Sequence, residues 1–97
     1  LTAKKRPAIV LQANNLQTRL NQLIIGMITT NPMRKGHKSR VFVDIHTETG
    51  KRTGLISDSV IMTDNIATVR LSEIYKRIGT FTEMDVMKES LKHTFEI

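Results

Sequence analysis

The sequence predicts a mainly β domain with helices at its C-terminal end, arranged as an antiparallel, strongly curved sheet or small barrel. Short runs rich in β-branched apolar residues, bounded by polar turn clusters, recur from residue 8 to residue 70. Helical signals appear only after residue 70. Because the chain has 97 residues, we expect residues 1–97 to form a single domain.

The first two strands are predicted at residues 8–11 and 20–28. The run AIVL follows Pro7 directly, and proline, which has no N–H to donate to a sheet, belongs at the first position of a strand. The run LNQLIIGMI fits a strand or a helix by periodicity alone. Its isoleucine pair and Gly26 favour a strand with a bulge or a close approach near the glycine.

A loop is predicted at residues 29–39, TTNPMRKGHKS, because an Asn-Pro pair and a glycine interrupt it. The next segment, 40–46, alternates, which predicts a strand. One face of this strand carries Val41, Val43 and Ile45, and the other carries Phe42 and Asp44. The polar run TETGKRTG at 47–54 predicts a turn at the end of a hairpin.

Two further strands are predicted at 58–64 and 66–70. A short helix is predicted at 71–79, with Ser72 as its N-cap and Gly79 as its stop. A longer helix is then expected to begin at Thr82, because the acidic residues that follow favour the positive end of the helix dipole.

Four apolar side chains of this last helix fall on one stripe, at Met84, Met87, Leu91 and Phe95. The stripe indicates packing against the core. A surface for a partner or a second copy is the alternative, because methionine adapts to irregular contacts.

Charge is distributed unevenly along the chain. The net charge is +6, from 15 cations and nine acids, and eight of the cations precede Asp44, which is the first acid. This pattern indicates a face for a polyanion, with nucleic acid as the first candidate, whereas lysines that only maintain solubility are the alternative. With three Phe, one Tyr and no Trp, the chain is poor in the aromatic residues of a stacking platform for single strands.

Several kinds of site are excluded or disfavoured. The absence of cysteine excludes disulfides and thiolate metal sites, and it fits a reducing compartment. The sequence contains no apolar run of membrane-spanning length, and neither G-x-G-x-x-G nor G-x-x-x-x-G-K-S/T occurs in it. Because the apolar run near residue 8 is short, we expect no signal peptide. His37, His46 and His93 lack the spacing of metal ligands, so we expect no metal. Asp58 and Asp64 are expected to share one face of a strand, where their charges would protect an exposed edge of the sheet.

Two polar positions are better candidates for chemistry. Arg6 stands at the start of the first strand, and Thr29 and Thr30 stand at the end of the second. If these strands are antiparallel neighbours, Arg6 and Thr29 meet at one rim of the sheet. A guanidinium and a hydroxyl on adjacent strands suit a phosphate group. The alternative is a surface arginine and a threonine that caps the loop.

Five segments, taken in order, carry a resemblance to a known family. They are RPAIV (6–10), MIT (27–29), GLISDSVI (54–61), NIATV (65–69) and IGTFTEMDVMKESL (78–91). Together they resemble the MazF/PemK family of toxin endoribonucleases, also called mRNA interferases, over nearly the whole chain. The sequence departs from the family at Ala67, where members have arginine, and at Asn65, where they have glutamine. The family's first strand, upstream of the Arg-Pro motif, has no counterpart in this sequence.

The resemblance implies an SH3-like, partly open β-barrel of the CcdB/PemK type that works as a homodimer. It also implies cleavage of single-stranded RNA, usually mRNA, without a metal or other cofactor, through attack by the RNA's own 2′-hydroxyl. Arg6 and Thr29 fall on the family's catalytic positions, with Arg6 stabilising the phosphorane charge and Thr29 holding the phosphate oxygens. Further RNA-binding candidates are Lys4, Lys5, Thr30, Arg34, Lys35, His37, Lys38, Asp64 and Asn65.

The expected setting is the cytoplasm of a prokaryote, where an acidic cognate antitoxin would lie across the basic groove. One alternative is a non-catalytic nucleic-acid-binding protein, or a toxin that targets DNA gyrase, with the same fold. A second alternative is an adaptor whose Met-rich helix docks a partner.

Overall fold

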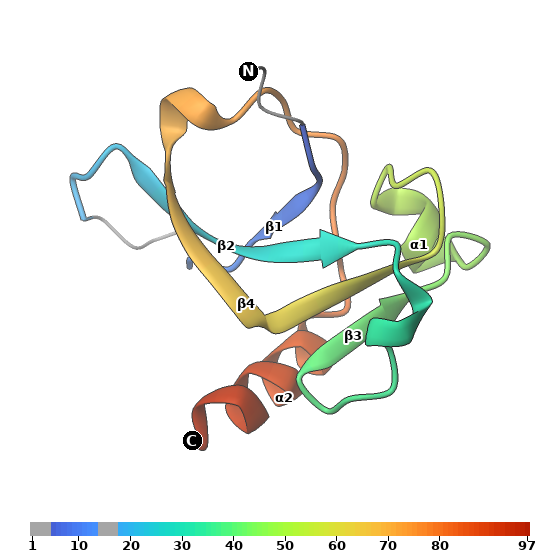
Figure 1. The fold of residues 1–97 in the computed structure, drawn as a ribbon. Coiled ribbons are helices and arrows are strands. Elements are labelled where there is room, and N and C mark those ends of the chain that lie inside the picture. The colour runs from blue at the N-terminus through green and yellow to red at the C-terminus, as the bar shows by residue number, and fades with distance from the viewer. Residues whose placement is uncertain (1–4, 14–17) are drawn as a thin grey trace.

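Four antiparallel strands form one sheet in the order β1–β2–β4–β3, and the sheet curves into a partly open barrel with α2 below it (Figure 1). The computed structural model describes residues 5–13 and 18–97. The elements are β1 (Ala8–Val10), β2 (Gln22–Thr29), the 3-10 turn η1 (Pro32–Arg34), β3 (Arg40–Val43), α1 (Glu48–Arg52), β4 (Ser59–Arg70), the 3-10 turn η2 (Leu71–Glu73) and α2 (Met84–Phe95). The predicted mainly β class with a C-terminal helix is confirmed.

The first two strands pair as the sequence predicts. β1 and β2 are antiparallel, with Ala8 opposite Met27 and Val10 opposite Ile25. The irregularity expected near Gly26 is also confirmed, because the register between β2 and β4 shifts between Gly26 and Met27. A Cβ atom on Gly26 would lie 3.3 Å from side-chain atoms of both Ile9 and Leu11, so the glycine lets β1 pass close by.

One strand replaces the two predicted at 58–64 and 66–70. β4 runs without a break from Ser59 to Arg70. Asp64 and Asn65 have the composition of a turn, but the strand accommodates them because β2 leaves residues 63–65 unpaired at the register shift. The extra residues bend β4, and the bend is visible in Figure 1.

The hydrophobic core lies between the sheet and α2. Its centre is formed by Val41 and Val43 of β3, Ile61 of β4 and Met87 of α2. The alternation predicted for residues 40–46 is confirmed as far as Val43, with Val41 and Val43 buried and Phe42 exposed. The chain then leaves the strand and turns toward α1, so β3 is shorter than expected.

A polar cluster of hydroxyl groups extends this core. The Thr63 side chain is fully buried, at 0% exposure, and its hydroxyl donates to the Ser39 carbonyl over 2.7 Å. The hydroxyl oxygens of Ser90 and Thr94 on α2 lie 2.9 Å and 2.7 Å from it. The cluster therefore ties β4, α2 and the start of β3 together with satisfied buried polar groups.

The polar run at 47–54 forms a helix, α1, and not the predicted turn. Thr47 caps it, because its hydroxyl oxygen accepts from the Gly50 N–H over 3.0 Å. Gly50 also packs against the preceding turn so closely that a Cβ atom there would lie 1.8 Å from the Asp44 carbonyl oxygen. Capping and this close approach outweigh the turn-like composition.

The helix predicted at 71–79 is wrong. Only η2, residues Leu71–Glu73, is helical, and Ser72 is inside the turn and not its N-cap. The rest of the segment is extended and reaches α1, where the Thr80 N–H donates to the Arg52 carbonyl over 2.9 Å. Gly79 is required for this approach and not as a helix stop, since its Cβ would lie 2.3 Å from the Thr53 backbone.

The last helix, α2, begins at Met84, two residues later than expected, and its N-cap residue is Glu83. Of the predicted apolar stripe, Met87 is buried at 1% exposure and Leu91 is half-buried. Met84 and Phe95 are exposed, at 47% and 56%, because the sheet above α2 reaches only the middle of the helix. Neither this helix nor any other in the described part of the chain is long and apolar enough to span a membrane.

Candidate active site

The candidate site lies on the face of the sheet that points away from α2. Residues paired across antiparallel strands share a face. Met62 pairs with Met27 on one side and with Arg40 on the other. Val60 pairs in the same way with Thr29 and Phe42. Ile61 and Thr63 point toward α2, so Val60 and Met62, which alternate with them, point to the opposite side together with the residues they pair with.

The bend of β4 shapes this face into an open, mainly polar depression. Four of the predicted site residues line it: Thr29, Arg34, Asp64 and Asn65. Sequence reasoning did not select the other three lining residues, which are Asn31, Arg40 and Met62. Arg40 had a detectable signal, because it alternates with Phe42 and Asp44 on the face opposite the apolar valines.

An ion pair between Arg40 and Asp64 spans the depression. The Arg40 Nη2 donates to Asp64 Oδ2 over 2.8 Å, and its Nε donates to Oδ1 over 3.4 Å. The remaining Nη1 donates to the Arg34 carbonyl over 3.2 Å. The hydrogen bond from Arg40 is the main reason that the pKa of Asp64 lies below its ordinary value of 3.8. Asp64 therefore stays ionised and orients Arg40.

Thr29 occupies the end of β2, where the strand meets the loop. Its hydroxyl oxygen accepts from the Asn31 N–H over 3.1 Å, and the Asn31 side chain accepts from the Met33 N–H over 3.0 Å. The loop-capping role considered as an alternative is therefore present. It does not consume the hydroxyl hydrogen of Thr29, which can still be donated to a ligand.

Arg6 lies beside Thr29 if the register is followed past the end of β1. Ala8 is opposite Met27, so two residues back on β1 and two residues forward on β2 bring Arg6 opposite Thr29. Arg6 is exposed and is not among the residues that line the depression.

The residues of the basic loop differ in whether they line the depression. Arg34 lines the depression, whereas Lys35 lies over the Phe42 ring, with its Nζ 4.4 Å from the ring centroid. The His37 ring packs edge-on against that of His93 on α2, with centroids 5.9 Å apart. Thr30 and Lys38 are exposed.

The remaining lysine candidates lie at the N-terminus. Lys4 is outside the described residues, and Lys5 places its Nζ over the Tyr75 ring.

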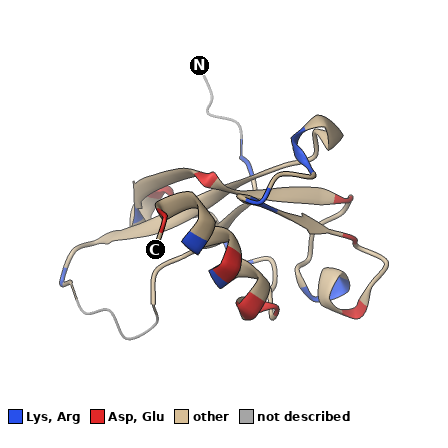
Figure 2. Ribbon diagram, turned by 90° about the horizontal axis from the view of Figure 1, so that it is seen from below, with Lys and Arg blue, Asp and Glu red and all other residues tan. Residues whose placement is uncertain are grey.

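Charges of both signs mix over the rest of the surface. Figure 2 shows cations and acids interspersed along α2. The depression is also mixed, because Arg40 is already paired with Asp64 and Arg34 adds one further cation.

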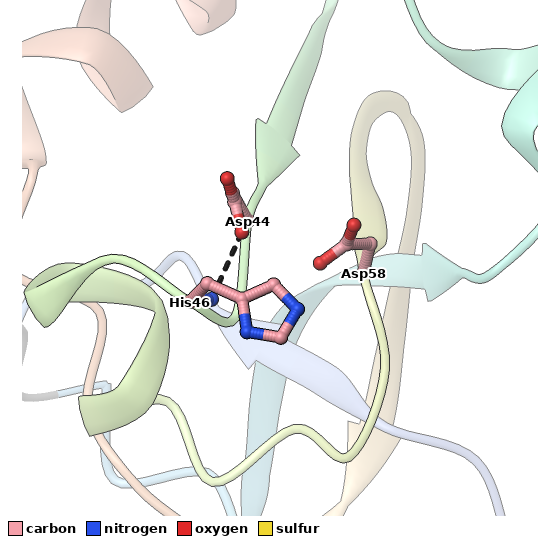
Figure 3. A group of neighbouring side chains, drawn as sticks. All are labelled: Asp44, His46 and Asp58. Carbon is pink, nitrogen blue, oxygen red and sulfur yellow. Dashed lines mark hydrogen bonds between the residues drawn. The ribbon is translucent and has the colours of Figure 1, made fainter.

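A second group of titratable side chains lies outside this site. Asp44, His46 and Asp58 bring their ligand-type atoms within 4.8 Å of one another between β3 and β4 (Figure 3). The spacing of the histidines in the sequence gave no sign of this. One oxygen of each carboxylate is engaged by the backbone: Asp44 accepts from the His46 N–H and Asp58 from the Ile45 N–H. Both aspartates thus stabilise the turn that leads into α1.

Comparison with solved structures supports the fold. A Mycobacterium tuberculosis toxin, described as Mtb toxin, matches with a TM-score of 0.77 and 24% identity over 93% of this chain and 92% of its own. The Mycobacterium tuberculosis toxin MazF-mt6 matches with a TM-score of 0.78 and 23% identity over 95% and 87%. An endoribonuclease from Mycobacterial species, in complex with its cognate antitoxin, matches at 0.75 and 18% over 95% and 82%.

No curated protein sequence matches the chain. A family model does match, over residues 2–93, and it describes the PemK-like, MazF-like toxins of type II toxin–antitoxin systems. The match covers nearly the whole chain and agrees with the resemblance of the five sequence motifs. This protein therefore belongs to the PemK-like, MazF-like family of type II toxin–antitoxin toxins.

Proposed function

We propose that this toxin is an endoribonuclease that cuts single-stranded RNA without a metal, with Arg6 and Thr29 at the reacting phosphate. The observation that carries the proposal is the register of β1 and β2, in which Ala8 lies opposite Met27; extending this register by two residues puts Arg6 opposite Thr29. Family membership supports the reaction class. Similar structures include endoribonucleases.

The reaction is a transfer within the RNA. The 2′-hydroxyl loses its proton to solvent, its oxygen bonds to the adjacent phosphorus, and the bond from phosphorus to the 5′-oxygen breaks. The products are a 2′,3′-cyclic phosphate and a 5′-hydroxyl. The Arg6 guanidinium donates hydrogen bonds to the charge that develops on the phosphorane oxygens, and the leaving 5′-oxygen takes its proton from water. Thr29 donates its hydroxyl hydrogen to a non-bridging oxygen.

The depression beside these residues binds the neighbouring nucleotide. Arg34 supplies a cation for a phosphate. The side-chain amides of Asn31 and Asn65 line the same space and offer donors and acceptors to base edges. The ion pair with Asp64 holds the Arg40 side chain in place in the lining of the depression. Lys35 and Lys38 of the basic loop, together with Lys4 and Lys5, attract the rest of the strand, and the exposed side chains of Thr30 and His37 offer hydrogen bonds to it.

The same surface accounts for the proposed partners. An acidic antitoxin segment competes with RNA for these cations, and a homodimer doubles the binding surface. The toxin and its antitoxin would meet in the cytoplasm, where mRNA is available.

The decisive experiment incubates the purified protein with a defined single-stranded RNA in EDTA and maps the cut ends. We expect cleavage with cyclic phosphate and 5′-hydroxyl ends. Arg6→Ala is expected to slow cleavage by about 100- to 1000-fold, since one donor aimed at developing charge contributes this much. Arg52→Ala removes an equal charge from the exposed surface of α1 and is the matched control.

Two outcomes would overturn the proposal. Intact RNA with tight, salt-sensitive retention indicates a binding module of the same fold. Equal losses in the Arg6 and Arg52 variants indicate that only net charge matters, and that no residue acts at the phosphate.

A further inference from the structure

The one tyrosine of the chain, Tyr75, is held open to solvent between two cations. Its side chain is 69% exposed, although Lys5 Nζ lies 3.3 Å from the ring centroid. Lys76 Nζ lies 5.7 Å from the same centroid. An exposed aromatic ring with ammonium groups around it offers a planar apolar surface and positive charge at one point.

The backbone that carries Tyr75 is anchored on both sides. Before it, the Leu71 N–H donates to the Asn21 carbonyl over 2.9 Å, and after it the Thr80 N–H donates to the Arg52 carbonyl over 2.9 Å. Gly54 reinforces the second anchor, because a Cβ there would lie 2.0 Å from the Ile78 carbonyl oxygen. Backbone hydrogen bonds therefore hold both ends of the segment that carries Tyr75.

The position of the ring relates it to the candidate active site. Lys5, which contacts the ring, immediately precedes Arg6 in the chain. Consecutive Cα atoms are about 3.8 Å apart, so the residue that contacts the ring and the residue proposed at the phosphate are neighbours in the chain. Arg77 follows Lys76 in the chain and adds a third cation to this segment and Lys5.

We propose that Tyr75, with Lys5 and Lys76, forms a stacking site for an unpaired base of single-stranded RNA, next to the phosphate bound at Arg6. This inference rests on the proposed nuclease function and adds a substrate contact to it. Aromatic stacking accepts any base because every base has a π-face, whereas the lysines contact the phosphates on either side. A single ring needs no larger aromatic platform, which this sequence lacks.

The composition of the chain provides a direct readout. Because the protein has one tyrosine and no tryptophan, its intrinsic tyrosine emission comes from Tyr75 alone. The probe is a short single-stranded RNA with 2′-O-methyl groups, which cannot be cut by 2′-hydroxyl attack. We expect saturable quenching of the emission as this RNA binds in EDTA, since a stacked base lies against the ring.

Substitutions then separate stacking from folding. Tyr75→Ala is expected to weaken binding of the probe about 5- to 100-fold, and Tyr75→Phe is expected to retain it. On cleavable RNA, Tyr75→Ala is expected to raise KM while kcat changes little, because the ring contacts a base and not the reacting atoms. Phe95→Ala removes an exposed ring from α2 and is the matched control. Thermal unfolding checks that each variant is folded.

The outcomes distinguish this inference from the function on which it rests. Quenching by the probe without cleavage of ordinary RNA supports the stacking site and overturns the nuclease. Cleavage with unchanged tyrosine emission, or unchanged binding and KM in Tyr75→Ala, overturns the stacking site alone. Absence of any RNA binding overturns it as well. An emission change that only an acidic peptide produces assigns the ring to a protein partner and also overturns it.

Discussion

The two faces of β4 differ in what their side chains do. On one face, Ile61 and Thr63 are almost completely buried against α2, where apolar packing and a closed set of hydroxyl contacts satisfy every group. On the other face, Met62 and Asp64 line an open depression, with Asp64 committed to a partially exposed ion pair. Because successive side chains of a strand alternate, one strand builds both the core and the candidate site. We expect substitutions on the two faces to affect stability and activity separately.

The largest expected effect is on the buried face. Met87→Ala is expected to lower the free energy of unfolding by about 2–5 kcal/mol, because it removes buried methylene groups and leaves a cavity beneath Val41 and Ile61. Urea denaturation measures this. Met84→Ala, at the exposed N-terminal end of the same helix, is the control and should change stability by less than about 0.5 kcal/mol. Equal losses would mean that α2 does not pack as described.

On the open face, Thr29→Val is expected to slow RNA cleavage about 100- to 1000-fold, because the proposed donor to the phosphate is lost. Its effect on stability should be limited to the hydrogen bond with the Asn31 N–H, about 0.5–1.5 kcal/mol. Initial rates and thermal unfolding measure the two quantities, and Thr29→Ser should restore the rate. A loss of cleavage rate that is explained by the unfolded fraction alone would contradict the expectation that the two faces affect stability and activity separately.

Thr63→Val is expected to lower the free energy of unfolding by about 1–3 kcal/mol, because it leaves buried hydroxyl and carbonyl groups without their shared partner. Cleavage by the folded fraction should not change. The matched control is Thr68→Val, a solvent-exposed threonine further along β4, and the same denaturation experiment reports on both. If the two variants are equally stable, the hydroxyl cluster contributes nothing.

The smallest effect concerns the ion pair, whose side chains are 21% exposed at Arg40 and 33% at Asp64. Since folding lowers the pKa of Asp64, the pair stabilises the protein above the ordinary pKa of 3.8, and this contribution is lost as the pH falls through the lower folded pKa. Asp64→Asn should lower the free energy of unfolding by at most about 1 kcal/mol at pH 7. At a pH below the folded pKa of Asp64, it should not change the free energy of unfolding. Unfolding curves between pH 7 and pH 2 test this; a constant difference across the range would contradict it.

Local sequence patterns predicted the sheet better than its connections. Pro7 and the apolar run after it marked β1, and Gly26 marked the irregularity in β2, because proline and glycine impose backbone geometry wherever they occur. The helix at 71–79 failed for the opposite reason. Its cap and stop signals are weak local preferences, and backbone contacts with α1 override them.

The candidate site was predictable only in part. Arg6 and Thr29 could be related from the sequence, because the pairing of adjacent antiparallel strands follows from their order and polarity. The partnership of Arg40 with Asp64 could not, since the two residues are 24 positions apart and meet only because β3 pairs with β4 in the register that puts Arg40 opposite Met62. The role proposed for Tyr75 was hidden in the same way, because it depends on a contact with Lys5, which is 70 positions earlier in the chain.

The amino-acid sequence by itself determined the class of the fold, the pairing of its first two strands and the family to which the chain belongs. These follow from backbone geometry, alternation and ordered motifs, all of which are local or nearly local. Only the tertiary structure decided that β4 is continuous, that α1 exists, and which polar side chains face one depression. Those outcomes depend on close packing between distant segments, whose energies exceed the small conformational preferences that a sequence displays.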